Sequence, residues 1–178
     1  MKLINHEKSK KNINILYINN YYALNTDDDF SILINELRKF DDYSINYFVK
    51  LLSKIKINSN YLICVVPSKK IKGRKSGIRE MCIRLLKKLP IENGLHLLHR
   101  VSDITPDSIR YGRPSVDEQF HSLELIDKQK IINKTIILFD DYIDSGNTII
   151  AAGTLFIEAG AQKVISITLG SKIDLMNF

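Results

Sequence analysis

The fold is decided by one stretch of sequence, Thr135-Ile136-Ile137-Leu138-Phe139-Asp140-Asp141-Tyr142-Ile143-Asp144-Ser145-Gly146-Asn147-Thr148. An apolar run ends there in two adjacent acids, and a small polar turn follows. A buried strand would carry Asp140 and Asp141 to the carboxyl edge of a sheet, and the turn would open a helix near Ile149. Backbone N–H groups and hydroxyls at a helix N-terminus can converge on a phosphate. The stretch therefore predicts a sugar-phosphate site whose acids face ribose hydroxyls, a divalent cation or both.

The alternative is an ordinary strand-turn-helix junction with a solvated pair of acids. It explains the sequence less well. A surface turn rarely needs two acids directly behind a buried strand together with a Ser-Gly-x-Thr phosphate cradle.

Composition favours one α/β domain over residues 1–178. The chain is 44% hydrophobic and long enough for a single core. Cys64 and Cys82 lack metal-ligand spacing, so we expect neither a disulfide framework nor a zinc ribbon. No apolar run is long enough to cross a bilayer and no signal peptide is visible, so we expect a cytoplasmic protein. The net charge of +6 suits an anionic ligand, but an abundance of Lys, Asn and Ile makes charge weak evidence.

Strand and helix patterns alternate along the chain. Apolar runs predict strands at 14–18, 61–66, 95–98, 135–139 and 164–169, and helical periodicity predicts helices at 30–40, 45–55, 78–89 and 148–158. We expect residues 1–12 to be a flexible tail and residues 101–120, which lack clear periodicity, to be a mobile loop. The alternation predicts an α/β fold with a three-layer arrangement, a parallel sheet covered by helices on both faces.

The quoted stretch resembles the phosphoribosyl-diphosphate (PRPP) binding motif of the type I phosphoribosyltransferases. In that motif four apolar residues precede two acids, two variable positions, a small Thr/Ser-rich pair, Gly, a variable residue and Thr or Ser. One position departs from it, because Asp144 stands where many members have Thr. An Asp at this position is familiar from the hypoxanthine-guanine branch. The order and lengths of the other segments look closest to the ComF-like group.

The resemblance implies how PRPP would be bound. The 5′-phosphate would lie on the turn, the ribose hydroxyls and Mg²⁺ at Asp140 and Asp141, and the diphosphate at the segment after the strand 61–66. The turn residues are Asp144, Ser145, Gly146, Asn147 and Thr148, and the diphosphate residues are Ser68, Lys69 and Lys70. Pro67 removes one backbone donor from the diphosphate segment. Lys69 and Lys70 also fit a solvated run of charge.

The resemblance also implies catalytic residues. Asp144 matches the proposed acid/base of the hypoxanthine-guanine branch, although an Asp there could instead cap the following helix. Arg100 and Arg113, with Arg110, could close over the leaving diphosphate, because guanidinium groups stabilise an expelled anion. Surface arginines in a loose loop are the alternative for each of them.

The expected function is transfer of the 5-phosphoribosyl group from PRPP to a nitrogenous base, with Mg²⁺ as cofactor, diphosphate as product and a purine-like acceptor slightly favoured. The sequence ends at Phe178, so we expect any base-covering hood to come from Tyr17 to Asp29 or from a partner chain in a possible homodimer. Two alternatives stay open. One is a regulator that binds PRPP or a nucleotide without turnover, and the other is a ComF-like accessory protein in DNA uptake or processing. Nucleic acid is a possible but not favoured partner, because no helix-turn-helix or zinc module is visible.

Overall fold

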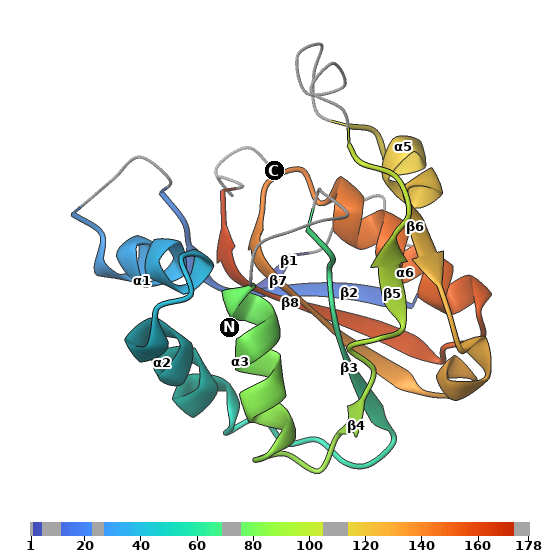
Figure 1. The fold of residues 1–178 in the computed structure, drawn as a ribbon, viewed down its shortest axis with the longest axis horizontal. Helices are drawn as coiled ribbons and strands as arrows, with labels where there is room; N and C mark the ends of the chain where they lie inside the picture. The colour runs from blue at the N-terminus through green and yellow to red at the C-terminus, as the bar shows by residue number, and fades with distance from the viewer. Residues whose placement is uncertain (1, 5–11, 23–26, 69–75, 105–113, 173–178) are drawn as a thin grey trace.

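A mostly parallel six-stranded sheet forms the centre of the molecule (Figure 1). The computed structural model describes residues 2–4, 12–22, 27–68, 76–104 and 114–172. The strands of the sheet are β1 (Lys2–Ile4), β2 (Ile13–Asn20), β3 (Tyr61–Val65), β4 (Glu92–Asn93), β7 (Thr135–Ile143) and β8 (Lys163–Ser171). Their order is β1-β2-β8-β7-β3-β4, and all neighbours are parallel except β1 and β2. This confirms the expected α/β class.

Strand β7 extends past its neighbour β3 at the carboxyl edge of the sheet. Pairing with β3 ends at Phe139, whereas pairing with β8 continues to Ile143. The strand thus carries Asp140 and Asp141 within it, where the sequence led us to expect that it would end before them. Because β3 has stopped, this last part of β7 has a sheet neighbour on one side only, and the other side is open to the chain that leaves β3.

Helices cover both faces of the sheet. One face carries α1 (Asp29–Arg38), α2 (Asp42–Leu52) and α3 (Gly77–Leu86), and the other carries α6 (Asn147–Glu158) with the shorter α5 (Val116–His121) and the 3₁₀ turn η1 (Lys128–Ile131). Side chains cap the first three helices, as Asp28, Asp41 and Ser76 each accept a hydrogen bond from a backbone N–H of the first turn. These caps set where each helix begins.

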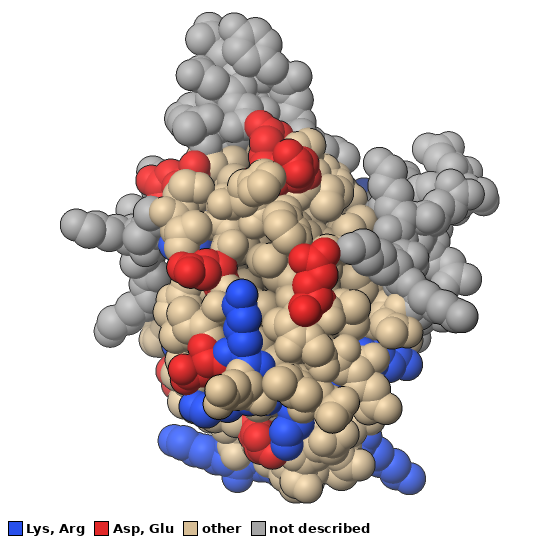
Figure 2. Space-filling view, turned by 90° about the vertical axis from the view of Figure 1, so that its right-hand side faces the viewer, with Lys and Arg blue, Asp and Glu red and all other residues tan. Residues whose placement is uncertain are grey.

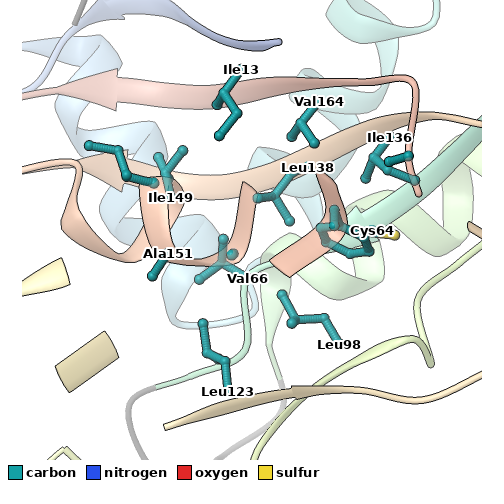
Figure 3. Packing of buried hydrophobic residues seen from close by; sticks show 14 of the residues in the cluster. Ile13, Cys64, Val66, Leu98, Leu123, Ile136, Leu138, Ile149, Ala151 and Val164 are labelled. Carbon is teal, nitrogen blue, oxygen red and sulfur yellow. The ribbon is translucent and has the colours of Figure 1, made fainter. Parts of the chain in front are cut away.

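Two apolar cores result, one on each face of the sheet. Figure 3 shows the core beneath α6, where Leu138 and Val164 of the sheet lie near Ile149 and Ala151 of the helix, all of them buried. The small antiparallel sheet of β5 (Leu98–Arg100) and β6 (Leu123–Leu125) closes the side of this core. The second core joins the other face to α1, α2 and α3. Both cysteines are buried and free.

Several short elements differ from the sequence-based expectations. Most of the strand expected at 95–98 is a turn, and β5, which follows it, pairs with β6 and not with the central sheet. Residues 116–121 form the helix α5, with a capping box between Ser115 and Glu118, inside the segment that we expected to be a loop. Within the expected tail, Lys2–Ile4 form β1 and pair with β2. The two-residue strand β4 was not expected at all.

The outer face on the α5 and α6 side carries charges of both signs. Figure 2 shows basic side chains standing among acidic ones there, separated by uncharged areas. Over its described residues this face is therefore not the continuous basic surface that a DNA-binding protein presents. In the part of the chain that the structure describes, no helix is long and apolar enough to cross a membrane.

Candidate functional site

A cavity of about 420 Å³ opens at the carboxyl edge of the sheet, beside the end of β7. Its walls come from segments far apart in the sequence: the end of β7 and the turn before α6, the chain that leaves β3, the end of α1, the start of α3, and side chains near β5 and α5. The lining residues are Arg38, Val66, Pro67, Ser68, Ser76, Ile78, Arg100, Pro114, Gln119, Asp140, Asp141, Tyr142, Ile143, Asp144, Ser145, Gly146, Thr148 and Ile149. Most of the predicted site residues that the structure describes thus meet in one cavity.

The turn before α6 is built around Gly146. This residue has a φ of 76° and occupies the N-cap position of α6. A left-handed backbone suits glycine because it has no Cβ. The N–H groups in the first turn of a helix have no partner within the helix, and the helix dipole makes this end positive. The turn therefore presents to the cavity the features that bind a phosphate.

Asn147 is the predicted phosphate residue that does not line the cavity. Its side-chain amide donates a hydrogen bond to the carbonyl of Pro114 at 2.8 Å, and its backbone N–H donates to Ser145 Oγ at 3.4 Å. The side chain therefore ties α6 to the chain before α5.

Asp144 is half-buried on the cavity wall, two residues before the N-cap position. We had left open that Asp144 caps the helix, but the N-cap residue is Gly146 and no side-chain hydrogen bond caps α6. The capping explanation for an acid at this position is therefore wrong. Its catalytic role stays a prediction.

The two adjacent acids differ in their partners. Asp140 Oδ1 accepts a hydrogen bond from the Asp141 N–H at 2.9 Å, and Asp141 Oδ1 accepts one from the Tyr142 N–H at 2.8 Å. The other oxygen of Asp141, Oδ2, lies 2.9 Å from Nε of Arg38. Burial, followed by the charge of Asp141, raises the pKa of Asp140 well above its usual range. A positive charge that enters the cavity would therefore stabilise the ionised form of Asp140.

The acid pair fits a magnesium ion only if a substrate supplies further ligands. The described residues contain no cluster of three or more His, Cys, Asp or Glu side chains that could hold a metal ion. Mg²⁺ is commonly held by one or two carboxylates together with substrate phosphates and water. Asp140 and Asp141 match that donor set.

Arg100 is buried beside the cavity and bound to the protein on several sides. Its Nε donates to the carbonyl of Ser68 at 2.6 Å, and its terminal nitrogens donate to Ser122 Oγ and to Gln119 Oε1. Burial lowers the pKa of Arg100, and the charges of Asp140 and Asp103 partly offset this by raising it. The guanidinium group thus joins β5 and α5 to the segment that leaves β3.

Several predicted site residues lie outside the described residues, namely Lys69, Lys70, Arg110 and Arg113. Ser68 is described, exposed and on the cavity wall.

Sequence reasoning missed Arg38, Ser76 and Gln119 as lining residues, and it did not single out Tyr142, which also lines the cavity. The Tyr142 ring packs against Tyr21, with centroids 4.9 Å apart, and the Lys172 Nζ lies 4.6 Å from its centre. Tyr142 could have been singled out, because it lies at a variable position inside the motif. Arg38 carries no signal beyond being a basic residue in the last turn of a helix.

The overall likeness to solved structures is distant. A search of the curated proteins found no match. A hypoxanthine phosphoribosyltransferase from Staphylococcus aureus is 13% identical with a TM-score of 0.45, and the match covers 82% of this chain and 69% of that one. A hypoxanthine-guanine phosphoribosyltransferase from Bacillus anthracis is 15% identical with a TM-score of 0.44, over 80% and 76% of the two chains. An allosteric regulatory enzyme of purine biosynthesis is 19% identical with a TM-score of 0.44, and this chain spans only 24% of its length.

The sequence itself matches the family model of the phosphoribosyl transferase domain over residues 79–174. The match runs from α3 through the acid pair and the Gly146 turn to beyond β8, and it covers more than half of the chain. It includes the elements that supply most of the described cavity wall. The ComF-like layout stays a prediction. The chain belongs to the phosphoribosyl transferase domain family.

Proposed function

We propose that this protein transfers the 5-phosphoribosyl group from PRPP to a nitrogenous base and releases diphosphate. The observation that carries the proposal is that the acid pair at the end of β7 and the Gly146 turn before α6 line the same cavity. PRPP combines a phosphate with a polyhydroxylated ring. Its site therefore needs phosphate-binding N–H groups close to acids that can accept from ribose hydroxyls. The family match supports the same reaction class.

We assign each part of PRPP to a group of residues at this cavity or next to it in the sequence. The 5′-phosphate would accept hydrogen bonds from the N–H groups of the turn and from the hydroxyls of Ser145 and Thr148. The ribose hydroxyls would donate to Asp140 and Asp141. The diphosphate would lie toward Ser68, with Lys69 and Lys70 following in the sequence. This assignment uses the positive helix end for the phosphate and keeps the acids for the neutral hydroxyls.

When bound, Mg²⁺ would supply positive charge that stabilises the departing diphosphate. Asp140 and Asp141 would hold it together with oxygens of PRPP. Arg100 would act as a positioning residue, because its bond to the Ser68 carbonyl fixes the segment beside the leaving group. Arg113 stays a candidate for direct contact with that group.

Transfer breaks the bond between the anomeric carbon and diphosphate and forms one from that carbon to the acceptor nitrogen. The ribose carries positive charge at the transition state, and the departing diphosphate carries the negative charge. Asp144 would accept the proton that the acceptor nitrogen loses as the new bond forms. A purine fits this role of Asp144 and can stack on Tyr142, the aromatic residue among the described lining residues.

A screen of purines, pyrimidines and related amines with PRPP and Mg²⁺ tests the function, with release of diphosphate as the readout. We expect diphosphate with at least one purine acceptor and none without PRPP. The matched control is the folded Asp140→Asn, Asp141→Asn variant, which should release no diphosphate. Tight PRPP binding with no diphosphate from any acceptor would contradict transfer and indicate a regulator instead.

A further inference from the structure

Arg38 is a cation built into the site by an element outside the motif. It lies in the last turn of α1, and its Nε is 2.9 Å from Oδ2 of Asp141. Its guanidinium carbon lies 5.1 Å from the centre of the Tyr142 ring, an arrangement that attracts a cation to the ring face. The side chain is 46% exposed and lines the cavity, so a ligand can reach it.

The helix end that carries Arg38 is held in place from two directions. The Tyr21 hydroxyl donates to Asn35 Oδ1 at 2.6 Å, which fixes the middle of α1 to the chain that leaves β2. At the other end, a Cβ on Gly77 would lie 1.9 Å from the carbonyl oxygen of Leu37, so the start of α3 packs directly against the end of α1. The position of Arg38 beside Asp141 is thus set by packing and does not depend on the ion pair alone.

Asp141 already has a protein partner for each of its oxygens. Oδ1 accepts a hydrogen bond from the Tyr142 N–H, and Oδ2 forms an ion pair with Arg38 Nε. An arginine guanidinium is protonated at every pH at which proteins are folded. The guanidinium therefore stays charged, and a divalent cation that coordinates Asp141 has to compete with it.

We propose that Arg38 is a counter-ion of the acid pair that prevents a divalent cation from binding tightly to the free protein, so that Mg²⁺ enters together with PRPP. Two carboxylates, one of them neutralised by Arg38, are too few ligands for Mg²⁺ without oxygens from the substrate. The proposal rests on the proposed function for the identity of PRPP. The counter-ion role itself rests on the ion pair and can be tested with the metal alone.

The test is a calorimetric titration of MgCl₂ into the full chain without PRPP, with the melting temperature in MgCl₂ and in NaCl of equal ionic strength as a second readout. In Arg38→Gln the acid pair loses the cation that pairs with Asp141 and should attract Mg²⁺ more strongly. We expect the apparent Kd for Mg²⁺ to fall by about tenfold or more relative to wild type. A tenfold change corresponds to about 1.4 kcal/mol of binding free energy. Only this variant should be stabilised by MgCl₂.

Two controls make the test specific. Lys39→Gln removes a positive charge from the adjacent residue, which pairs with Glu36 at 2.6 Å and is 70% exposed, so its Mg²⁺ affinity should equal that of wild type. Adding Asp141→Asn to Arg38→Gln should abolish the gained affinity. Equal Mg²⁺ affinity in the wild type, Arg38→Gln and Lys39→Gln proteins, all folded, would overturn the proposal.

A PRPP titration in the presence of Mg²⁺ separates this proposal from the proposed function. If Arg38→Gln gains Mg²⁺ affinity but no variant binds PRPP, the counter-ion role stands and the proposed function fails. If wild type binds PRPP with Mg²⁺ but Arg38→Gln gains no Mg²⁺ affinity, the counter-ion role is overturned and the proposed function stands.

Discussion

Asp144 is the residue that bears most directly on which acceptor the protein uses. It lies on the cavity wall and does not cap α6, so helix capping is not the reason for an acid at this position. For Asp144→Asn we expect turnover with a purine acceptor to fall by about 10²–10⁴-fold, because the amide cannot accept the acceptor's proton. PRPP affinity should stay near that of wild type. Steady-state kinetics and calorimetry measure the two quantities, and equal turnover in the two proteins would remove Asp144 from the mechanism.

Asp140 is predicted to make the protein less stable as the pH rises. Burial, then the charge of Asp141, raise its pKa in the folded state. The folded protein then holds this proton more tightly than the unfolded chain does, so stability falls as the pH rises from the ordinary Asp range, about 4, through the raised pKa. Asp140→Asn removes that loss and should raise the melting temperature at pH 7.5, with a difference that shrinks toward pH 4.

The matched control for this pH profile is Asp117→Asn, because the side chain of Asp117 is 84% exposed. It should show no such pH-dependent gain. A melting temperature of Asp140→Asn below that of wild type at pH 7.5 would mean that Asp140 is stabilised by its surroundings, contrary to the site described here.

The residues of the motif could be predicted from the sequence, whereas their protein partners could not. Asp140, Asp144 and Gly146 lie together because they are close in the chain, at the end of one buried strand and in the turn that follows it. Arg38 and Gln119 reach the same cavity from α1 and α5, and no local pattern reports contacts between distant elements. Arg100 was predicted to close over the leaving diphosphate, but its guanidinium is buried against Ser68, Gln119 and Ser122.

At the scale of elements, the junction of β7 and α6 is the functional unit. Gly146→Val should weaken PRPP and nucleoside monophosphates alike, because a β-branched residue is strained at a φ of 76° and its side chain would block the approach of phosphate to the backbone. Nucleosides, which lack the phosphate, should bind as before. Calorimetry with a monophosphate and its nucleoside gives the comparison, and an unchanged monophosphate affinity in the folded variant would show that the turn is not a phosphate site.

Long elements were predictable and short ones were not. The apolar runs of β3, β7 and β8 and the helical periodicity of α1, α2, α3 and α6 are strong local signals. The strand β4 has two exposed residues, and α5 is a six-residue helix in a segment without apolar periodicity. Such elements are stabilised by a neighbouring strand or by a capping box, and their apolar pattern is too short to detect.

At the scale of the whole molecule, the sheet order determines which segments meet. Because β7 lies between β8 and β3, the chain that leaves β3 faces the acid pair, and α6 begins beside it. Ligands of parallel sheets bind at the carboxyl ends of the strands. The general location of the site therefore followed from strand and helix alternation, whereas its cation, Arg38, depended on how α1 packs.

The central claim, that this cavity binds PRPP through the acid pair, is tested most directly by calorimetric titration of PRPP with Mg²⁺ into wild type and into Asp140→Asn, Asp141→Asn. The account predicts saturable binding to wild type and none to the double variant, with both proteins folded, because the variant loses the ribose and cation contacts while its cores are untouched. A folded double variant that binds PRPP as tightly as wild type would contradict the account.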